Sequence, residues 1–363
     1  KTLILTHPLT GNYGCLLQAY ASYTVLNALG CNAYIFRYTP NDLPIKSFSY
    51  FKYLGSLLKL FLGMQENRIW RQLYIANQFT KNMKCISEAR NVLECDEIRY
   101  VVGSDQVWRA IYCRQMKSPE FYFLSFATTK QRHNSVAYAA SFGIDEWEGN
   151  EKETRECSQL LNEFKAVSVR EQSGINICRS IMNVEAVQMP DPTLLLERKD
   201  YENIINESKT WMPKTPWIAS YILDESPQIT QLLGKCSQNL NVSHQSLIPS
   251  KHAKRWQDRI IHTVPQWLRL ILNAKYFITD SFHGCVFAII FNKPFVCLGN
   301  KSRGSARFES LLKTFGLESR LISSPSPQEL SKLLKSPIDW EHVNRILLGE
   351  QERGINFLKE HLT

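Results

Sequence analysis

The chain has 363 residues, of which 44% are hydrophobic and 21% are charged, a composition typical of a globular protein that buries a core. The length suits two domains, and no apolar run reaches the roughly 20 residues that a membrane-spanning helix needs. The net charge of +9 favours anionic ligands or surfaces, but no recognition helix or RNA-binding strand motif is present, so nucleic acid is set aside as a partner.

Strand-like and helix-like segments alternate along nearly the whole chain. Apolar runs predict first-half strands at 2–6, 33–38, 99–102, 135–140, 165–169 and 185–188. Helical patterns lie between them, notably at 14–29, 65–83, 151–163 and 171–181. Second-half strands are predicted near 217–223, 241–247, 275–279, 294–298 and 320–322. This alternation is typical of an α/β fold in which helices cover both faces of a parallel sheet.

A Pro- and Lys-rich stretch at 208–216, SKTWMPKTP, separates the two halves and marks the predicted domain boundary. We therefore expect an N-terminal domain at 1–207 and a C-terminal domain at 208–337. Residues 338–363 carry one long helical pattern, and we expect this helix to pack back on the N-terminal domain.

A helical insertion is predicted at 45–85, because aromatic and leucine residues recur at helical spacing within 48–74. Four basic residues lie among them: Lys52, Lys59, Arg68 and Arg71. Two interpretations are open. The segment is an amphipathic helix pair that rests on an anionic membrane surface, or it is an ordinary insertion that packs in the core.

Polar residues follow the first predicted strand. Gly11 and Gly14 open a helix there, with Asn12 and Tyr13 between them, and the free N–H groups of a helix start suit an anion or a sugar hydroxyl. A tight structural turn is the alternative explanation for the glycines of this stretch.

Two further strand ends of the first half carry polar side chains. Asp105 and Gln106 follow the strand at 99–102, at the edge where open α/β sheets bind ligands, although Asp105 also suits a helix cap. Arg170 follows the strand at 165–169 and suits a carboxylate or phosphate; its alternative partner is Glu171 in a surface ion pair.

In the second half, TDSFHG at 279–284 lies between the end of a predicted strand and the start of a predicted helix. His283 falls in the first helical turn, where the positive end of the helix dipole favours a neutral ring that can act as base or donor. Asp280 either orients that ring or caps the helix. The next strand leads to Lys301, Arg303 and Arg307 beside another helix start, so we expect a pocket for a small, multiply charged anion.

The ten cysteines form neither a C-x-x-C pair nor a zinc-binding spacing with histidine. We expect reduced thiols in a cytoplasmic protein and no bound metal.

Seven motifs occur in order along the chain: GNYGCLLQAYA, GSDQVWR, YAASFG, VSVRE, MPDPTLLL, TDSFHGCVFAIIFNKPFV and RGSARFESLL. This series resembles the polysaccharide pyruvyl transferase family and covers most of the chain. The resemblance implies two Rossmann-like domains that face each other across a cleft, as in the GT-B fold, with the acceptor on the N-terminal side and the donor on the C-terminal side. It also implies phosphoenolpyruvate as donor substrate, with no separate cofactor, and a glycan that receives a pyruvate ketal.

The same resemblance implies surface or capsular polysaccharide biosynthesis on a lipid-linked acceptor, at the cytoplasmic face of the membrane. The roles that we expect are catalysis by His283 and Asp280, donor binding by Arg170, Ser281, Lys301, Arg303 and Arg307, and acceptor binding by Asn12, Tyr13, Asp105 and Gln106. Many members of the family have TDRLH where this chain has Ser281 and Phe282. We expect Arg303 or Arg307 to supply the missing charge, unless the donor differs. The alternative functions are a glycosyltransferase that uses a nucleotide sugar and a non-catalytic member that binds glycans.

Overall fold

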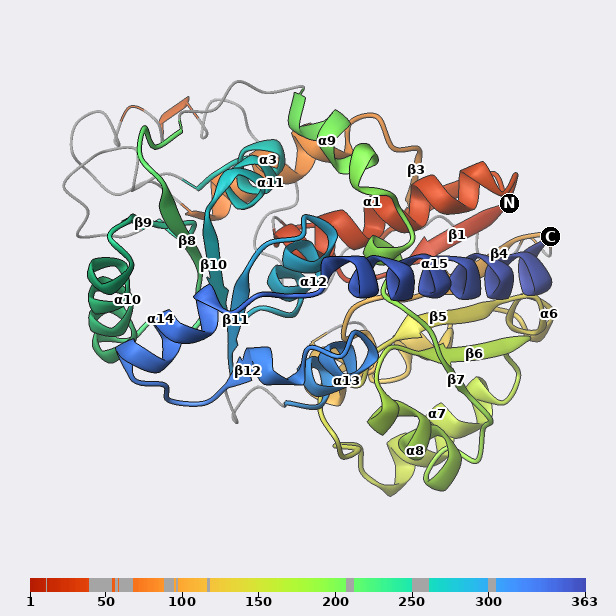
Figure 1. The fold of residues 1–363 in the computed structure, drawn as a ribbon. Helices are drawn as coiled ribbons and strands as arrows, with labels where there is room; N and C mark the ends of the chain where they lie inside the picture. The colour runs from red at the N-terminus through yellow and green to blue at the C-terminus, as the bar shows by residue number, and fades with distance from the viewer. Residues whose placement is uncertain are drawn as a thin grey trace.

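The computed structural model describes residues 1–10, 12–38, 54–55, 58, 68–87, 95, 97–115, 118–206, 212–249, 261–299 and 305–363. Within these residues, the strands form two parallel sheets, one of seven strands and one of five. Figure 1 shows the first sheet on the right and the second on the left, with the first sheet built before residue 207 and the second after it.

The first sheet has the strand order β3-β2-β1-β4-β5-β6-β7. Its strands are β1 (Thr2–Leu5), β2 (Ala33–Arg37), β3 (Cys85–Ser87), β4 (Arg99–Val102), β5 (Val136–Ala140), β6 (Ala166–Val169) and β7 (Val187–Gln188). The second sheet has the order β12-β11-β10-β8-β9. Its strands are β8 (Trp217–Tyr221), β9 (Ser243–Ser246), β10 (Tyr276–Thr279), β11 (Phe295–Leu298) and β12 (Leu321–Ile322).

Each sheet has one switch point, a place where successive crossovers run in opposite directions along the sheet. In the first sheet it lies between β1 and β4, which pair in parallel with Leu5 opposite Val102. In the second it lies between β8 and β10, with Tyr221 opposite Thr279. Open α/β sheets bind their ligands at the carboxyl ends of the strands at such points.

Helices connect the strands and cover the sheets. The first half has α1 (Tyr13–Ala28), α3 (Arg68–Thr80), α5 (Ala110–Cys113), the 3-10 helix η1 (Phe121–Phe123), α6 (Thr129–His133), α7 (Glu151–Leu161), α8 (Gln172–Ser180), η2 (Pro192–Leu194) and α9 (Arg198–Asn206). The second half has α10 (Pro227–Leu240), α11 (Val264–Asn273), α12 (Phe282–Ile290), α13 (Ala306–Thr314), η5 (Glu318–Arg320), α14 (Pro327–Lys335) and α15 (Trp340–Leu362). The local sequence determines where some helices begin. Asn150 with Glu153 forms a capping box at the start of α7, and Ser326 with Glu329 forms one at the start of α14.

The two halves share one apolar core. The largest buried cluster contains residues of α1 together with residues of α11 and α12. Tyr13 of α1 stacks on Trp267 of α11 with ring centroids 5.0 Å apart, and its hydroxyl donates to the carbonyl of His262 at 2.6 Å. This contact ties the start of α1 to the second half, where Tyr13 also lies 5.9 Å from the Tyr221 ring at the end of β8.

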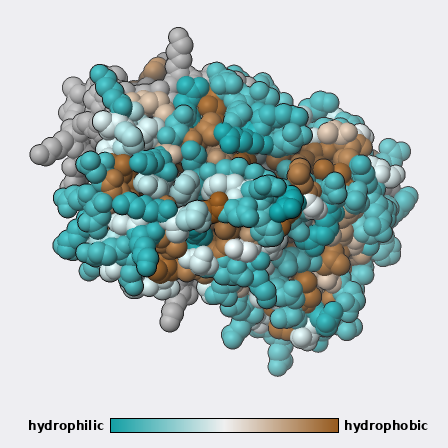
Figure 2. All heavy atoms as spheres, viewed as in Figure 1, coloured by the Kyte–Doolittle hydropathy of each residue, from teal (hydrophilic) through white to brown (hydrophobic). Residues whose placement is uncertain are grey.

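The last helix, α15, returns to the first half and lies across the first sheet (Figure 1). The Gln351 side chain donates to the carbonyl of Leu196 at 3.1 Å, and the rings of Phe357 and Tyr138 lie 5.9 Å apart. On the face that carries α15, hydrophilic side chains dominate and apolar ones form small separate patches (Figure 2). Among the described residues, no helix combines the length and the apolar character needed to cross a bilayer.

Much of the predicted insertion at 45–85 lies outside the described residues, including Lys52 and Lys59. Its described part contains α3 and β3. For Arg71 the structure contradicts the membrane-surface interpretation and agrees with the packed insertion. Arg71 is 9% exposed, its Nε donates to the carbonyl of Ile261 at 3.2 Å, and its guanidinium carbon lies 5.6 Å from the Tyr74 ring centroid. Arg71 therefore holds α3 against the second half.

Candidate active site

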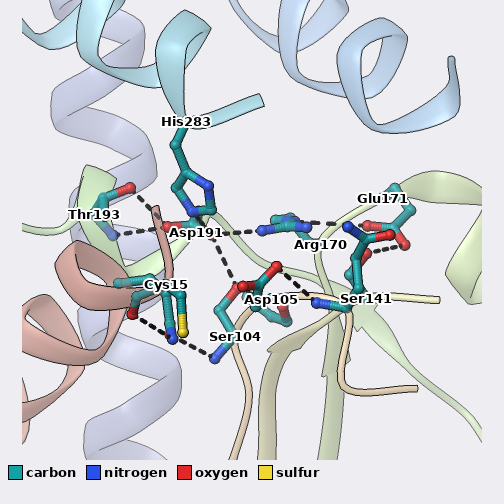
Figure 3. A network of polar contacts seen from close by, with 12 residues as sticks. Cys15, Ser104, Asp105, Ser141, Arg170, Glu171, Asp191, Thr193 and His283 are labelled. Carbon is teal, nitrogen blue, oxygen red and sulfur yellow. Dashed lines mark hydrogen bonds and ion pairs between the residues drawn. The ribbon is translucent and has the colours of Figure 1, made fainter. Parts of the chain in front are cut away.

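A network of polar and charged side chains joins strand ends of the first half to the start of α12. Strand ends of the first half supply Ser104, Asp105, Arg170 and Asp191, and the first turn of α12 supplies His283. Figure 3 shows His283 pointing from its helix toward Asp191 and Arg170. Side chains that are distant in sequence therefore converge on one small volume.

Asp191 is the centre of this network and is only 1% exposed. Its Oδ1 accepts from the backbone nitrogen and the hydroxyl of Thr193 at 3.0 and 2.7 Å. Its Oδ2 accepts from Ser104 Oγ and from Arg170 Nη1, each at 2.9 Å, and lies 3.6 Å from His283 Nε2. Burial raises the pKa of Asp191, but His283, Arg170 and the Thr193 hydrogen bond outweigh it and hold the pKa well below its usual range. The carboxylate is therefore charged at neutral pH.

Arg170 leaves the end of β6 with a side chain that is 2% exposed. Its Nε lies 3.8 Å from Glu171 Oε2, and its guanidinium carbon lies 4.1 Å from the Phe282 ring centroid. Its Nη2 is buried and makes no hydrogen bond to the described residues. Although burial lowers the pKa of Arg170, the charges of Asp191, Glu171 and Asp105 raise it overall. Arg170 is thus a fixed cation with a donor still available to an anion.

Glu171 pairs with Arg170 inside the protein and not at the surface, and it also binds the backbone. Its side chain is fully buried, and its Oε1 accepts from Ser141 Oγ, Phe142 N and Gly143 N at 2.8, 2.9 and 3.2 Å. The expected pairing of Arg170 with Glu171 is thus present, but its expected place at the surface is wrong, because both side chains are buried.

Arg307 reaches the same region from the first turn of α13. This helix is fastened to the first half by a hydrogen bond of 2.8 Å between Gln188 Nε2 and Ser310 Oγ. Burial and the charge of Arg170 lower the pKa of Arg307 to about 10, while Glu171 and Asp105 oppose that change. The charges of two guanidinium groups, one from each half, therefore oppose each other, and a bound anion would offset that repulsion. Arg303 and Lys301 lie outside the described residues.

Gly14 allows α1 and α12 to approach closely. A Cβ atom at this position would lie 2.1 Å from His283 Nδ1, far inside any real contact. The glycine is therefore needed for the position of His283, beyond a tight turn alone. His283 is 8% exposed, and its Nε2 makes no hydrogen bond to the described residues.

Asp280 and Ser281 fasten the backbone around the start of α12. The two oxygens of Asp280 accept from the backbone nitrogens of Leu223 and Asp224 at 2.6 and 2.9 Å. Ser281 Oγ caps α12 by accepting from Gly284 N at 3.4 Å. The carboxylate beside His283 is that of Asp191, so the structure places Asp191 where the sequence suggested Asp280.

The predicted acceptor-side residues separate into two groups. Asn12 caps α1, with its Oδ1 accepting from Gly14 N at 3.0 Å, and Tyr13 belongs to the shared core, being 4% exposed. Asp105 lies within the network and accepts from Gln106 N at 2.9 Å. Burial raises the pKa of Asp105, but nearby His7, His283 and Arg170 lower it overall, so Asp105 is a charged hydrogen-bond acceptor.

Gln106 lies beside Asp105, at the edge of the network. Its Oε1 is 3.5 Å from Arg109 Nη1, and a Cβ on Gly143 would lie 2.2 Å from the same oxygen. The Gln106 side chain is thus held between Arg109 and the loop after β5.

The sequence motifs left His7 and Asp191 without a role. His7 follows β1, and its Nδ1 lies 3.0 Å from the Tyr122 hydroxyl oxygen. Both residues come directly after strand-like runs, TLILT and VQMP, and this position is the signal by which they could have been found.

Metal-binding clusters and thiols near the network are two further features that bear on the chemistry of the described part of the chain. No group of three or more His, Cys, Asp or Glu side chains there could hold a metal ion. The cysteines are free, and burial raises the pKa of Cys15 well above its usual range, so this thiol beside the network stays protonated.

A family model described as polysaccharide pyruvyl transferase matches residues 12–302. No curated protein matches the chain. Among solved structures, UGT71G1 of Medicago truncatula, complexed with UDP-glucose, aligns over 99% of this chain and 98% of its own, at 10% identity and a TM-score of 0.50. The glycotransferase of kitacinnamycin aligns over 100% and 98%, at 10% identity and a TM-score of 0.49. At such identities the likeness concerns the fold alone, which is GT-B: two parallel α/β sheets.

Proposed function

Because the chain belongs to the polysaccharide pyruvyl transferase family, we propose that it transfers pyruvate from phosphoenolpyruvate to two hydroxyls of one glycan sugar as a ketal. The observation that carries this proposal is the pair of buried arginines, Arg170 and Arg307, one from each half, of which Arg170 shares Asp191 with His283. Phosphoenolpyruvate has a phosphate and a carboxylate on a three-carbon frame. Two fixed cations in a buried site are suited to bind these two anionic groups, more than they are suited to a neutral sugar.

The chemistry requires several proton transfers. Two bonds form between the central carbon of phosphoenolpyruvate and sugar oxygens, and the bond from that carbon to the phosphate oxygen breaks. Two hydroxyl protons are lost: one joins the methylene carbon, which becomes the methyl group, and the other leaves with phosphate. Acid–base side chains are therefore needed next to the anion site.

In this proposal His283 transfers the proton to the methylene carbon, while Arg170 and Arg307 hold the phosphate and carboxylate. Asp191 keeps Arg170 and His283 in place and stabilises the charged ring. Asp105 and Gln106 accept and position the sugar hydroxyls. Asn12 and Tyr13 support them by fixing the start of α1, and Ser281 and Asp280 do so for α12.

The setting of the reaction is part of the proposal. A glycan carried on a lipid at the cytoplasmic face of the membrane, during surface or capsular polysaccharide biosynthesis, fits a transferase of this family. Arg303 and Lys301, close to Arg307 in sequence, are further candidates for donor binding.

A product assay tests the proposed function. The protein would be incubated with a panel of glycan acceptors and either phosphoenolpyruvate or a panel of sugar nucleotides. We expect phosphate release and a product heavier by one pyruvate less one water, with a methyl singlet in its proton spectrum. Sugar transfer from a nucleotide, with no product from phosphoenolpyruvate, would establish the glycosyltransferase alternative instead.

A further inference from the structure

His7 belongs to the network but has no role in the scheme above. It follows β1 at the switch point, beside the turn that carries Asp105: the Thr6 hydroxyl donates to the carbonyl of Ser104 at 3.3 Å. The edges of Tyr112 and Tyr122 enclose its ring, with centroids 5.7 and 5.3 Å away. His7 therefore has a fixed orientation inside the site.

A chain of hydrogen bonds determines which nitrogen of His7 carries the proton. The Tyr38 hydroxyl donates its one hydrogen to the carbonyl of Thr6 at 2.9 Å. The short contact between the hydroxyls of Tyr38 and Tyr122 must then be donated by Tyr122. Having given its hydrogen away, the Tyr122 oxygen can only accept from His7, across the 3.0 Å contact with Nδ1. Neutral His7 thus carries its proton on Nδ1 and has a lone pair on Nε2.

The surroundings of that lone pair suit a base. His7 Nε2 is buried and makes no hydrogen bond to the described residues. Burial lowers the pKa of His7, and Arg170 lowers it further, against the opposing effects of Asp105 and the Gln106 carbonyl. The titratable groups that face or adjoin His7 are Asp105, Arg170, Tyr38, Tyr122, Tyr112 and Cys15.

Most of these neighbours keep one charge state near neutral pH. The pKa of Asp105 is lowered and that of Arg170 is raised, so both stay charged. Burial raises the pKa of Tyr38, Tyr122 and Cys15, so they stay neutral. A change of charge on His7 would therefore occur among neighbours whose charges do not change with it.

We propose that His7 is a second catalytic base, whose Nε2 takes the proton of the second sugar hydroxyl as that hydroxyl closes the ketal. The inference rests on the proposed function, which needs two hydroxyl protons removed from one sugar. The oxygen lone pair forms the new bond to the central carbon, from which phosphate has departed, and the proton passes from His7 to that phosphate. The carboxylate of Asp105 stabilises the imidazolium that exists between these two steps.

The proton position can be measured without any substrate. In protein labelled with ¹⁵N-histidine, long-range ¹H–¹⁵N spectra distinguish the two neutral forms, and the signals of His7 are those lost in His7→Asn. We expect a protonated Nδ1 and an unprotonated Nε2 at neutral pH. A proton on Nε2 would overturn the inference, because that atom could then not act as a base.

Kinetics test the catalytic role. We expect His7→Asn to lower kcat for pyruvyl transfer about 10²–10⁴-fold, with little change in KM for phosphoenolpyruvate. Wild type should lose activity at low pH, where His7 is protonated, and the remaining activity of His7→Asn should not show that loss. His244→Asn is the matched control, since His244 is also buried but bonds to Ser220 Oγ at 2.8 Å in the second sheet. We expect this variant to keep wild-type kcat.

Tyr122→Phe separates positioning from packing. It removes the acceptor for Nδ1–H but keeps both the ring and His7, so we expect a lower kcat and both neutral forms of His7 in the spectra. Full activity in His7→Asn would overturn the role of His7 alone. Wild-type protein that does not use phosphoenolpyruvate would overturn the proposed function and the role of His7 together, whatever the spectra show.

Discussion

At the scale of single residues, the site depends on one buried carboxylate. Asp191 receives hydrogen bonds from Thr193, Ser104 and Arg170, and it lies beside His283. Such a group stabilises the fold only while its partners compensate the loss of water. Asp191 thus links the stability of the folded protein to the geometry of its proposed catalytic groups.

Asp191→Asn should lower the free energy of unfolding at pH 7 by about 3–5 kcal/mol, since it leaves the buried charge of Arg170 without its closest partner. The pKa of Asp191 is lower in the folded protein than in the unfolded chain. Its stabilisation is therefore present above the unfolded value of about 4 and is lost as the pH falls below it.

Urea denaturation of wild type and Asp191→Asn at pH 7 and at pH 3 tests this expectation. The difference between the two proteins should shrink at the lower pH. Glu185→Gln is the control, because Glu185 pairs with Arg179 at the surface, where such a pair contributes about 0–1 kcal/mol. Equal stability of wild type and Asp191→Asn at pH 7 would contradict the claim that Asp191 stabilises the fold by compensating the charge of Arg170.

At the scale of elements, the site depends on how closely two helix starts approach. Gly14→Ala adds a Cβ that would meet His283 Nδ1 at 2.1 Å, so α12 or the histidine must move. We expect a loss of kcat of at least about tenfold, because small misplacements of a proton-transfer group are costly. The measurement is turnover of phosphoenolpyruvate by purified variants.

Gly234→Ala in α10 is the matched control for Gly14→Ala. No heavy atom lies within 4 Å of a Cβ built there, so this variant should keep wild-type activity and gain up to about 1 kcal/mol of stability from the helix. If Gly14→Ala were as active as Gly234→Ala, the close approach of α1 and α12 would not matter for the reaction.

The last helix offers a second matched pair. In α15, a Cβ on Gly354 would lie 2.5 Å from the Tyr138 hydroxyl and 2.6 Å from a Leu195 methyl, whereas one on Gly349 meets nothing within 4 Å. We expect Gly354→Ala to lower the free energy of unfolding by about 1–3 kcal/mol and Gly349→Ala to leave it unchanged or higher. Thermal unfolding of both measures this, and equal stability of the two would mean that α15 is not packed on the first sheet.

At the scale of the whole molecule, the α/β fold with two Rossmann-like sheets was predictable and is confirmed. Parallel strands such as TLIL and YFIT are short, mostly apolar runs, which a single sequence reveals directly. The strand β3 was missed because Cys85–Ser87 is a three-residue edge strand with no such run. The domain limits at 207 and 337 stay predictions.

The site was predictable only in part. Arg170, Asp105 and His283 follow strand ends, as do His7 and Asp191, and a rule about parallel sheets points to this position. The roles of Asp191 and His7 depend on partners more than twenty residues away in sequence, among them Tyr38, Arg170 and His283, and no local pattern records those contacts. Tyr13 looked like a ligand contact, but its neighbours in the second half place it in the core.

The central claim is that two buried arginines, one from each half, bind phosphoenolpyruvate. Calorimetric titration of phosphoenolpyruvate into wild type, Arg307→Gln and the surface control Arg179→Gln tests it most directly. A charged hydrogen bond contributes about 1.5–3 kcal/mol, so Arg307→Gln should weaken binding roughly 10–150-fold, while Arg179→Gln should bind as wild type does. Equal affinity in Arg307→Gln and wild type would contradict the claim, as would wild-type protein that binds a sugar nucleotide but not phosphoenolpyruvate.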